Sequence, residues 1–230
     1  MKSNLIRIVG IVAPADRYLK SENQIWLFGF LVVNLAAFAI VAYIGLDGLP
    51  RAIQWVQSHW ESLSAVGLGV VVTTIISNLV SPQLKAVLVF WRWHNPLPGH
   101  RAFTRYLGKD PRIDPDRLRV KIGDFPNDPS EQNRLWYRIY RSHESEPSVM
   151  GAHRDFLLTR DITWLSFAMF VLFGLGSALL GESVLQTAWY PVLLASQYLI
   201  ASIAARRNGI RFVLNVLAIE SSSSRRIKKG

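Results

Sequence analysis

The chain contains no cysteine, which excludes disulfide bonds, thiolate metal sites and cysteine nucleophiles. Charged residues are also scarce, at 18% of 230 residues against about 25% in an average soluble domain. The deficit is concentrated in four blocks that lack Lys, Arg, Asp and Glu altogether: 25–44, 63–80, 162–180 and 184–205. Each block is close to the ~20 apolar residues that span a ~30 Å hydrocarbon core.

Recognisable catalytic chemistry is missing as well. The sequence has no glycine-rich phosphate-binding loop and no Gly-x-Ser-x-Gly nucleophile motif. Its five histidines show no paired metal-ligand spacing, and no ionisable residue lies inside an apolar block, which disfavours a proton relay. We therefore expect no enzyme, no catalytic residues, no metal and no cofactor.

The four blocks predict an all-α membrane protein with four transmembrane helices and a small, mostly helical cytoplasmic insert between the second and third. Two alternatives are a buried core helix, which four blocks in one short chain disfavour, and a cleaved signal peptide for the first block. A signal peptide would have a shorter apolar run and a small-residue cleavage site. The first block is long and ends without such a site, so we interpret it as a retained span.

Basic residues between the blocks predict the orientation, because Lys and Arg stay cytoplasmic. The N-terminal segment has four, the first connection one, the insert from Lys85 to Arg160 fourteen, the second connection none and the tail seven. Both termini and the insert are therefore expected inside a bacterial inner membrane. The expected divisions are a cytoplasmic segment 1–24, helices 1 and 2 in 25–93, the insert 94–161, helices 3 and 4 in 162–205, and an interfacial helix with a basic tail in 206–230.

The insert carries two helix signals. Asp128-Pro129-Ser130-Glu131 supplies an N-cap, a proline at the first helical position and an acid at the third, which predicts a helix from Pro129 to about His143. A further helix should begin near Pro147 and continue into the third span, because neither Gly nor Pro interrupts 152–173. The stretch 110–128 shows little periodicity and is expected to be an ordered loop, and 210–219 suits a separate helix lying at the membrane surface.

The second span, predicted from Ser62 to about Trp93 with a kink at Pro82, has a polar face. Small and polar residues recur there at helical spacing: Gly67, Thr74, Ser77, Asn78, Ser81 and Lys85. Such a face must be buried against protein or water, since unsatisfied polar groups in hydrocarbon are costly. Either it is a helix-packing seam, or it lines a water-filled pathway between subunits. Because four short spans make a thin bundle, we expect a homo-oligomer with this face toward the bundle or the symmetry axis.

Arginine provides the other candidate site. On the helix predicted from Pro129, one side is apolar and the opposite side combines three arginines with a tyrosine: Arg134, Tyr137, Arg138 and Arg141. One interpretation is a solvated cytoplasmic surface. The other is a binding site for a soluble protein or a phosphate-bearing signal, because guanidinium groups bind phosphate bidentately. Nothing in the sequence indicates nucleic acid directly.

Several short stretches resemble an uncharacterised family of bacterial multi-pass inner-membrane proteins: 95–99 (NPLPG), 102–103 (AF), 110–114 (DPRID), 132–137 (QNRLWY) and 160–161 (RD). In layout the chain is also similar to small membrane effectors of bacterial antiviral defence systems. That resemblance implies an effector, ion channel or membrane-disrupting subunit controlled through the insert. The alternatives are a membrane anchor for a soluble cytoplasmic partner and, third, a membrane enzyme.

Overall fold

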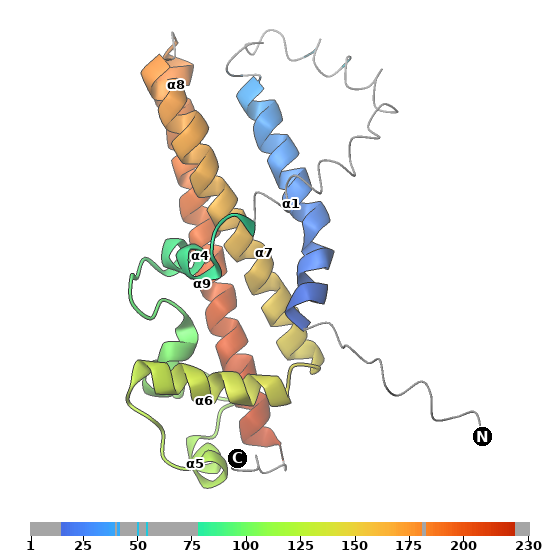
Figure 1. Cartoon of the computed structure of the whole chain (residues 1–230), viewed down its shortest axis with the longest axis vertical. Helices are drawn as coiled ribbons and strands as arrows, with labels where there is room; N and C mark the ends of the chain where they lie inside the picture. The colour runs from blue at the N-terminus through green and yellow to red at the C-terminus, as the bar shows by residue number, and fades with distance from the viewer. Residues whose placement is uncertain are drawn as a thin grey trace, which may run out of the picture.

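The computed structural model describes residues 15–39, 41, 50, 54, 78–180 and 183–223, apart from the side chains of 15–21, 39 and 180. Within these ranges the fold is all-helical and contains no strand. Helices α7 and α9 pack antiparallel along the length of the molecule, and α1 packs against α7 (Figure 1). The α-helices are α1 (Ala15–Ala39), α4 (Pro82–Phe90), α5 (Pro115–Ile122), α6 (Pro129–Ser142), α7 (Pro147–Met169), α8 (Leu175–Leu180) and α9 (Tyr190–Ser222).

Two helices of the described chain are long and apolar enough to cross a membrane. The first, Pro147–Leu179, has 33 residues and joins α7 to α8 through a π-helical turn; its most apolar 18-residue stretch has a mean hydropathy of 1.9. The second, Leu185–Ser222, has 38 residues, and its most apolar 18-residue stretch has a mean hydropathy of 1.3. Only 28% of the apolar window of each is buried, whereas the core helix of a soluble protein would be mostly buried. The exposed apolar side chains suit contact with lipid.

The sequence predicted four membrane helices, and the described residues contain two of the required length and composition. The apolar part of α1, Glu22–Phe38, is shorter than that requirement. The second predicted span lies outside the described residues except for its last positions, 78–80. The N-terminal patch 5–12 and the basic tail beyond 223 also lie outside them.

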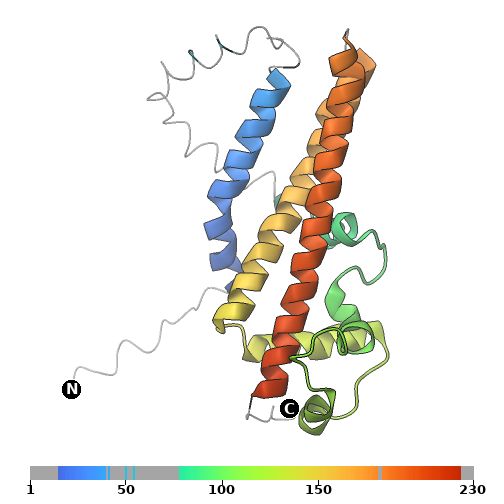
Figure 2. The same cartoon turned by 180° about the vertical axis from the view of Figure 1, so that it is seen from behind.

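At one end of the long pair, residues 94–146 form a helical unit that we call the cap. Its helix α6 lies across α7 and α9, with α5 beyond it (Figures 1 and 2). The cap and the two long helices share one hydrophobic core, whose larger members include Trp136, Ile139, Tyr140, Phe156, Phe212 and Leu217. One end of α7 and one end of α9 therefore pack in the same core as the cap, although these helices also form the apolar pair.

The prediction of a helix from Pro129 is confirmed. The carboxylate of Asp128 accepts a hydrogen bond from the Glu131 amide at 2.9 Å, and Pro129 occupies the first turn, where no amide hydrogen is needed. The predicted helix from Pro147 into the third span is confirmed as well. The prediction that 110–128 is a loop is wrong, because it contains α5. There Asp114 accepts hydrogen bonds from the amides of Asp116 and Arg117, and Pro115 opens the helix.

Two further boundaries differ from the prediction. The described end of the second span is not continuous with α4, because Ser81 is extended (φ −60°, ψ 146°) and caps α4 at Pro82. Proline disfavours helical geometry in the residue before it, so Pro82 begins a helix here instead of kinking one. The expected separate helix 210–219 does not exist. Its residues continue α9 without a break to Ser222, because Phe212, Val213 and Val216 are buried against the cap.

Candidate functional site

The arginine face predicted from the sequence lies on α6 and is exposed. Its members Arg134, Tyr137, Arg138 and Arg141 are all exposed, whereas Trp136, Ile139 and Tyr140 on the other side are buried. The predicted division of this helix into two faces is therefore confirmed. A role of the exposed face in binding stays a prediction.

The arginines of this face differ in their partners. Arg141 donates to the Glu144 carboxylate at 2.6 Å, so its charge is locally balanced. Arg134 and Arg138 form no ion pair with any other described residue. Residues four apart on a helix lie ~6 Å from each other, which places two free guanidinium groups close together with Tyr137 beside them. This arrangement can bind a phosphate or a carboxylate presented from outside the molecule.

The polar face predicted for the second span is only partly described. Gly67, Thr74 and Ser77 lie outside the described residues. Of the others, Asn78 is exposed, and Ser81 is exposed and accepts a hydrogen bond from the Leu84 amide at 3.2 Å. Lys85 is buried. The prediction of one face through Asn78, Ser81 and Lys85 is therefore wrong, because the chain leaves the helical conformation at Ser81.

Lys85 instead belongs to a buried cluster of charges. Its Nζ donates to Oδ1 of Asp161 at 2.9 Å, and the two side chains are 3% and 7% exposed. The same oxygen accepts two hydrogen bonds from the Arg160 guanidinium, both at 3.1 Å. One carboxylate therefore holds two cations, and it ties α4 to α7.

A sequence signal for this cluster existed. Lys85 is the first charged residue after the second apolar block, and Asp161 is the last one before the third. Charges that end neighbouring antiparallel spans lie at the same depth in a membrane, so opposite charges there are candidates for pairing. The pair lies just outside the apolar blocks, so a search for charges inside them does not find it. The buried Asn34 was missed too, although its Oδ1 accepts from Gln197 of α9 at 3.0 Å.

A cavity of about 950 Å³ lies where the cap meets the long helices. Its walls come from α1, position 78, α4, the segment 95–100, α6, α7 and α9, and they include Ala86, Trp136, Tyr137, Phe156, Arg160 and Phe212. Small-molecule sites have volumes of roughly 300–1,000 Å³, apolar walls and a few polar groups. This cavity fits that description, and an occupant would contact the cap and both long helices at once.

Two polar atoms of the cavity-lining residues are buried without a hydrogen-bond partner in the described chain: Asn133 Oδ1 and Trp136 Nε1. One is an acceptor and the other a donor, and both are covered by protein atoms. Gly99 lies against them, because a Cβ at this position would be 2.4 Å from Asn133 Oδ1 and 2.9 Å from Trp136 Cε3. The glycine of the 95–99 segment is therefore required for the chain to pass α6 closely.

Two histidines lie in the cavity wall. His153 Nδ1 is 3.1 Å from the Tyr140 hydroxyl, and its ring stacks on Phe212 with 4.5 Å between centroids. His100 Nδ1 is 3.0 Å from the Pro129 carbonyl oxygen. Burial lowers the pKa of His100, and the nearby Arg101 charge adds to this, against the opposing effect of the Pro129 carbonyl. His100 is therefore held in its neutral form at neutral pH.

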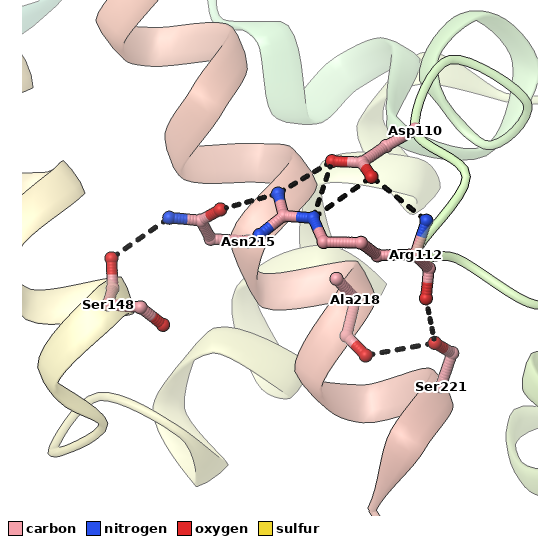
Figure 3. A network of polar contacts seen from close by, with 6 residues as sticks. All are labelled: Asp110, Arg112, Ser148, Asn215, Ala218 and Ser221. Carbon is pink, nitrogen blue, oxygen red and sulfur yellow. Dashed lines mark hydrogen bonds and ion pairs between the residues drawn. The ribbon is translucent and has the colours of Figure 1, made fainter.

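A polar network fastens the cap loop to both long helices (Figure 3). Arg112 binds the Asp110 carboxylate, with its closest contact at 2.6 Å, and donates to Asn215 Oδ1 of α9 at 2.9 Å. Asn215 Nδ2 in turn donates to the Ser148 carbonyl of α7 at 3.0 Å, and the Ser221 hydroxyl donates to the Arg112 carbonyl at 3.2 Å. The hydrogen bonds from Arg112 lower the pKa of Asp110.

The described residues thus offer three candidate features: the exposed arginine face, the buried charge cluster and the cavity between the cap and the long helices. Comparison with known proteins adds no relative from which a role could be transferred. The chain matches no family model, no curated protein and no solved structure.

Proposed function

We propose that this protein is an oligomeric, multi-pass inner-membrane effector that permeabilises the membrane under the control of its cytoplasmic cap. The proposal includes four spans, with α1 and the block 63–80 added to the two long helices. In support, α1 packs along α7, and its buried Asn34 pairs with Gln197 of α9 inside the apolar region. Polar pairs between helices stabilise membrane bundles. Both termini and the cap are placed on the cytoplasmic side because Lys and Arg gather there.

The single observation that carries the proposal is the continuity between the cap and the long helices. Helices α7 and α9 run without a break from their apolar parts into the core of the cap. The cavity is lined by both helices and by α6. A ligand or partner that alters the packing at this junction therefore acts on the spans directly, because a packed helix transmits displacement as a rigid element.

Oligomerisation follows from the second span. Its polar residues require burial against protein or water, and a thin bundle of four helices offers little room for them. In the proposed assembly the part of this face that precedes Ser81 turns toward the bundle or the symmetry axis, where it packs or lines a pathway. The exposed position of Asn78 at the end of the span is compatible with a contact to a second copy.

A second candidate function is a membrane anchor for a soluble cytoplasmic protein. The exposed pair Arg134 and Arg138, with Tyr137 between them and no acid bound in the described chain, favours it. Arginine and tyrosine are enriched where interfaces concentrate their binding energy. An acidic surface or a phosphate group on the partner would be the matching chemistry.

The two functions differ in their response to matched substitutions. For an effector, high expression in bacteria raises the assembled fraction by mass action, and a voltage-sensitive dye should report loss of membrane potential. Asn78→Leu should prevent this loss, while cross-linking shows the same oligomer as in wild type. For an anchor, the potential should stay normal in both, and a pull-down should lose its partner only in Arg138→Glu. A normal potential in cells that contain the wild-type oligomer would refute the effector.

A further inference from the structure

The end of α4 is fixed to α9 by interactions that position Trp91. The indole Nε1 of Trp91 donates to the Tyr198 hydroxyl at 2.9 Å, and that hydroxyl donates to the Leu88 carbonyl at 2.9 Å. Arg206 donates to the Val89 carbonyl at 2.5 Å and stacks over the Trp91 ring at 3.7 Å from its centroid. Trp91 is also left-handed (φ 55°), which ends the helix and turns the chain toward the segment 92–97.

The end of α4 and the turn at Trp91, which we call the corner, lie at the depth where the long helices change from apolar to charged residues. Arg206 is the first charged residue of α9 after its apolar part, and the corresponding residues of α7 are Arg160 and Asp161. The two levels match, because Asn208 Nδ2 of α9 donates to Thr159 Oγ1 of α7 at 3.2 Å. The corner is therefore at the expected boundary between hydrocarbon and headgroups.

The aromatic side chains at this boundary are exposed. Trp91 is 53% and Trp93 is 77% exposed, and Leu84 on the preceding turns is 42% exposed. Tryptophan is enriched at headgroup depth, because its ring is apolar and its N–H is polar. A site with exposed apolar side chains beside it suits a lipid better than a free phosphate ion.

Three arginines near the corner have no acidic partner in the described chain. Arg92, Arg101 and Arg105 form no ion pair with any described residue. Burial lowers the pKa of Arg101 and the charge of Arg92 lowers it further, whereas Tyr106 raises it. The Arg101 guanidinium donates to the carbonyls of Asn95 and Pro96, at 3.4 and 3.3 Å, and these neutral groups leave its charge unbalanced by a described acid. The exposed Arg92 and the half-buried Arg101 therefore suit an anionic group.

We propose that Arg92, Arg101 and Arg206, together with Trp91 and Trp93, form a binding site for the headgroup of an anionic phospholipid in the cytoplasmic leaflet. The guanidinium groups bind the phosphate, and the tryptophans contact the glycerol and upper acyl region. The site depends on the membrane placement of the long helices and not on permeabilisation. Its test and the dye measurement above therefore have independent outcomes.

The test is native mass spectrometry of the protein purified in mild detergent with equal amounts of phosphatidylglycerol and phosphatidylcholine. Wild type should retain phosphatidylglycerol in clear preference. The double variant Arg92→Gln/Arg101→Gln should lower that retention roughly 25-fold, at about fivefold for each arginine, which corresponds to about 1 kcal/mol each. The matched control is Arg117→Gln/Arg119→Gln on α5, at the far end of the cap from α4 (Figure 1), and it should retain the lipid.

Three results would overturn the proposal. They are equal retention of the two lipids by wild type, unchanged retention in the double variant, and displacement of the lipid by 10 mM inorganic phosphate, which would indicate an anion site without lipid specificity. If the double variant fails to fold, the single variant Arg92→Gln carries the test, since Arg92 is exposed and its substitution leaves the packing intact. That variant should lower retention about fivefold.

Discussion

Lys85 and Asp161 lie 76 positions apart in the sequence, and their side chains meet at 2.9 Å in the interior of the protein. The contact joins α4 to α7 at the depth where the apolar part of α7 begins. Because Arg160 binds the same carboxylate oxygen, Asp161 is the shared partner of two cations. These three residues therefore hold α4, which follows the apolar block 63–80, against α7.

The first prediction follows from the fact that two cations share the one carboxylate of Asp161. Asp161→Leu leaves two buried cations without their carboxylate and should cost about 3–5 kcal/mol. Lys85→Met should cost clearly less, because Asp161 keeps its hydrogen bonds from Arg160. Thermal unfolding in detergent measures both. Equal losses of stability in the two variants would show that the carboxylate is not shared as described.

The second prediction concerns Gly99. Gly99→Ala places a Cβ within 2.4 Å of Asn133 Oδ1 and should destabilise the cap by about 1–3 kcal/mol, as overpacking does. Gly151→Ala is the control, since nothing lies within 4 Å of a Cβ there. Gly151 is inside α7, so alanine should stabilise the protein by about 0.5–1 kcal/mol. A Gly99→Ala protein that melts at the wild-type temperature would contradict the close approach.

The third prediction is a dependence on pH. The hydrogen bonds from Arg112 depress the pKa of Asp110 in the folded state, so the folded state binds this proton less readily than the unfolded chain. Its contribution to stability is complete above the unfolded value of about 4 and is lost as the pH falls through the lower folded value. The destabilisation by Asp110→Asn should thus be about 1 kcal/mol at pH 7 and should vanish in strong acid. A difference that stayed constant down to acid pH would count against the interaction.

Elements with a local cause could be predicted from the sequence. Asp128 and Pro129 determine the start of α6 within four residues, and the apolar stripe that follows determines its buried face. The same signature at Asp114 and Pro115 marks the start of α5. That helix is short and only one of its residues, Leu118, is buried, so no apolar stripe follows the signature. Ser81 was read as one member of a helix face, although a serine before a proline is also a typical N-cap.

Features with a tertiary cause could not be predicted. Helix α9 continues through Gly209, and the rings of Phe156 and Phe90 pack against this glycine in the space that a Cβ would need. Such contacts compensate for a residue that is unfavourable in a helix by ~1 kcal/mol. The cavity likewise requires segments from α1 to α9 to converge, and no single stretch of sequence indicates it.

The fourth prediction concerns the exposed face of α6. Arg134→Glu/Arg138→Glu should leave the melting temperature and the oligomer unchanged, because exposed substitutions alter stability by less than ~0.5 kcal/mol. The same variant should lose most of its activity or its captured partner if the face receives the controlling signal. Arg141→Gln serves as the comparison, since that arginine is already bound to Glu144. Full activity of the double variant would identify the face as solvated surface.

The most direct test of the account is dye release from vesicles containing purified protein, because the chain has no native cysteine to interfere with a designed disulfide. The double variant Thr159→Cys/Asn208→Cys replaces the hydrogen bond between α7 and α9 near the cap cavity with a disulfide. Wild type should release the dye, the oxidised pair should release much less, and a reducing agent should restore release. Equal release before and after oxidation of a verified disulfide would contradict control of the membrane through the cap, and no release from vesicles that contain the wild-type oligomer would contradict permeabilisation.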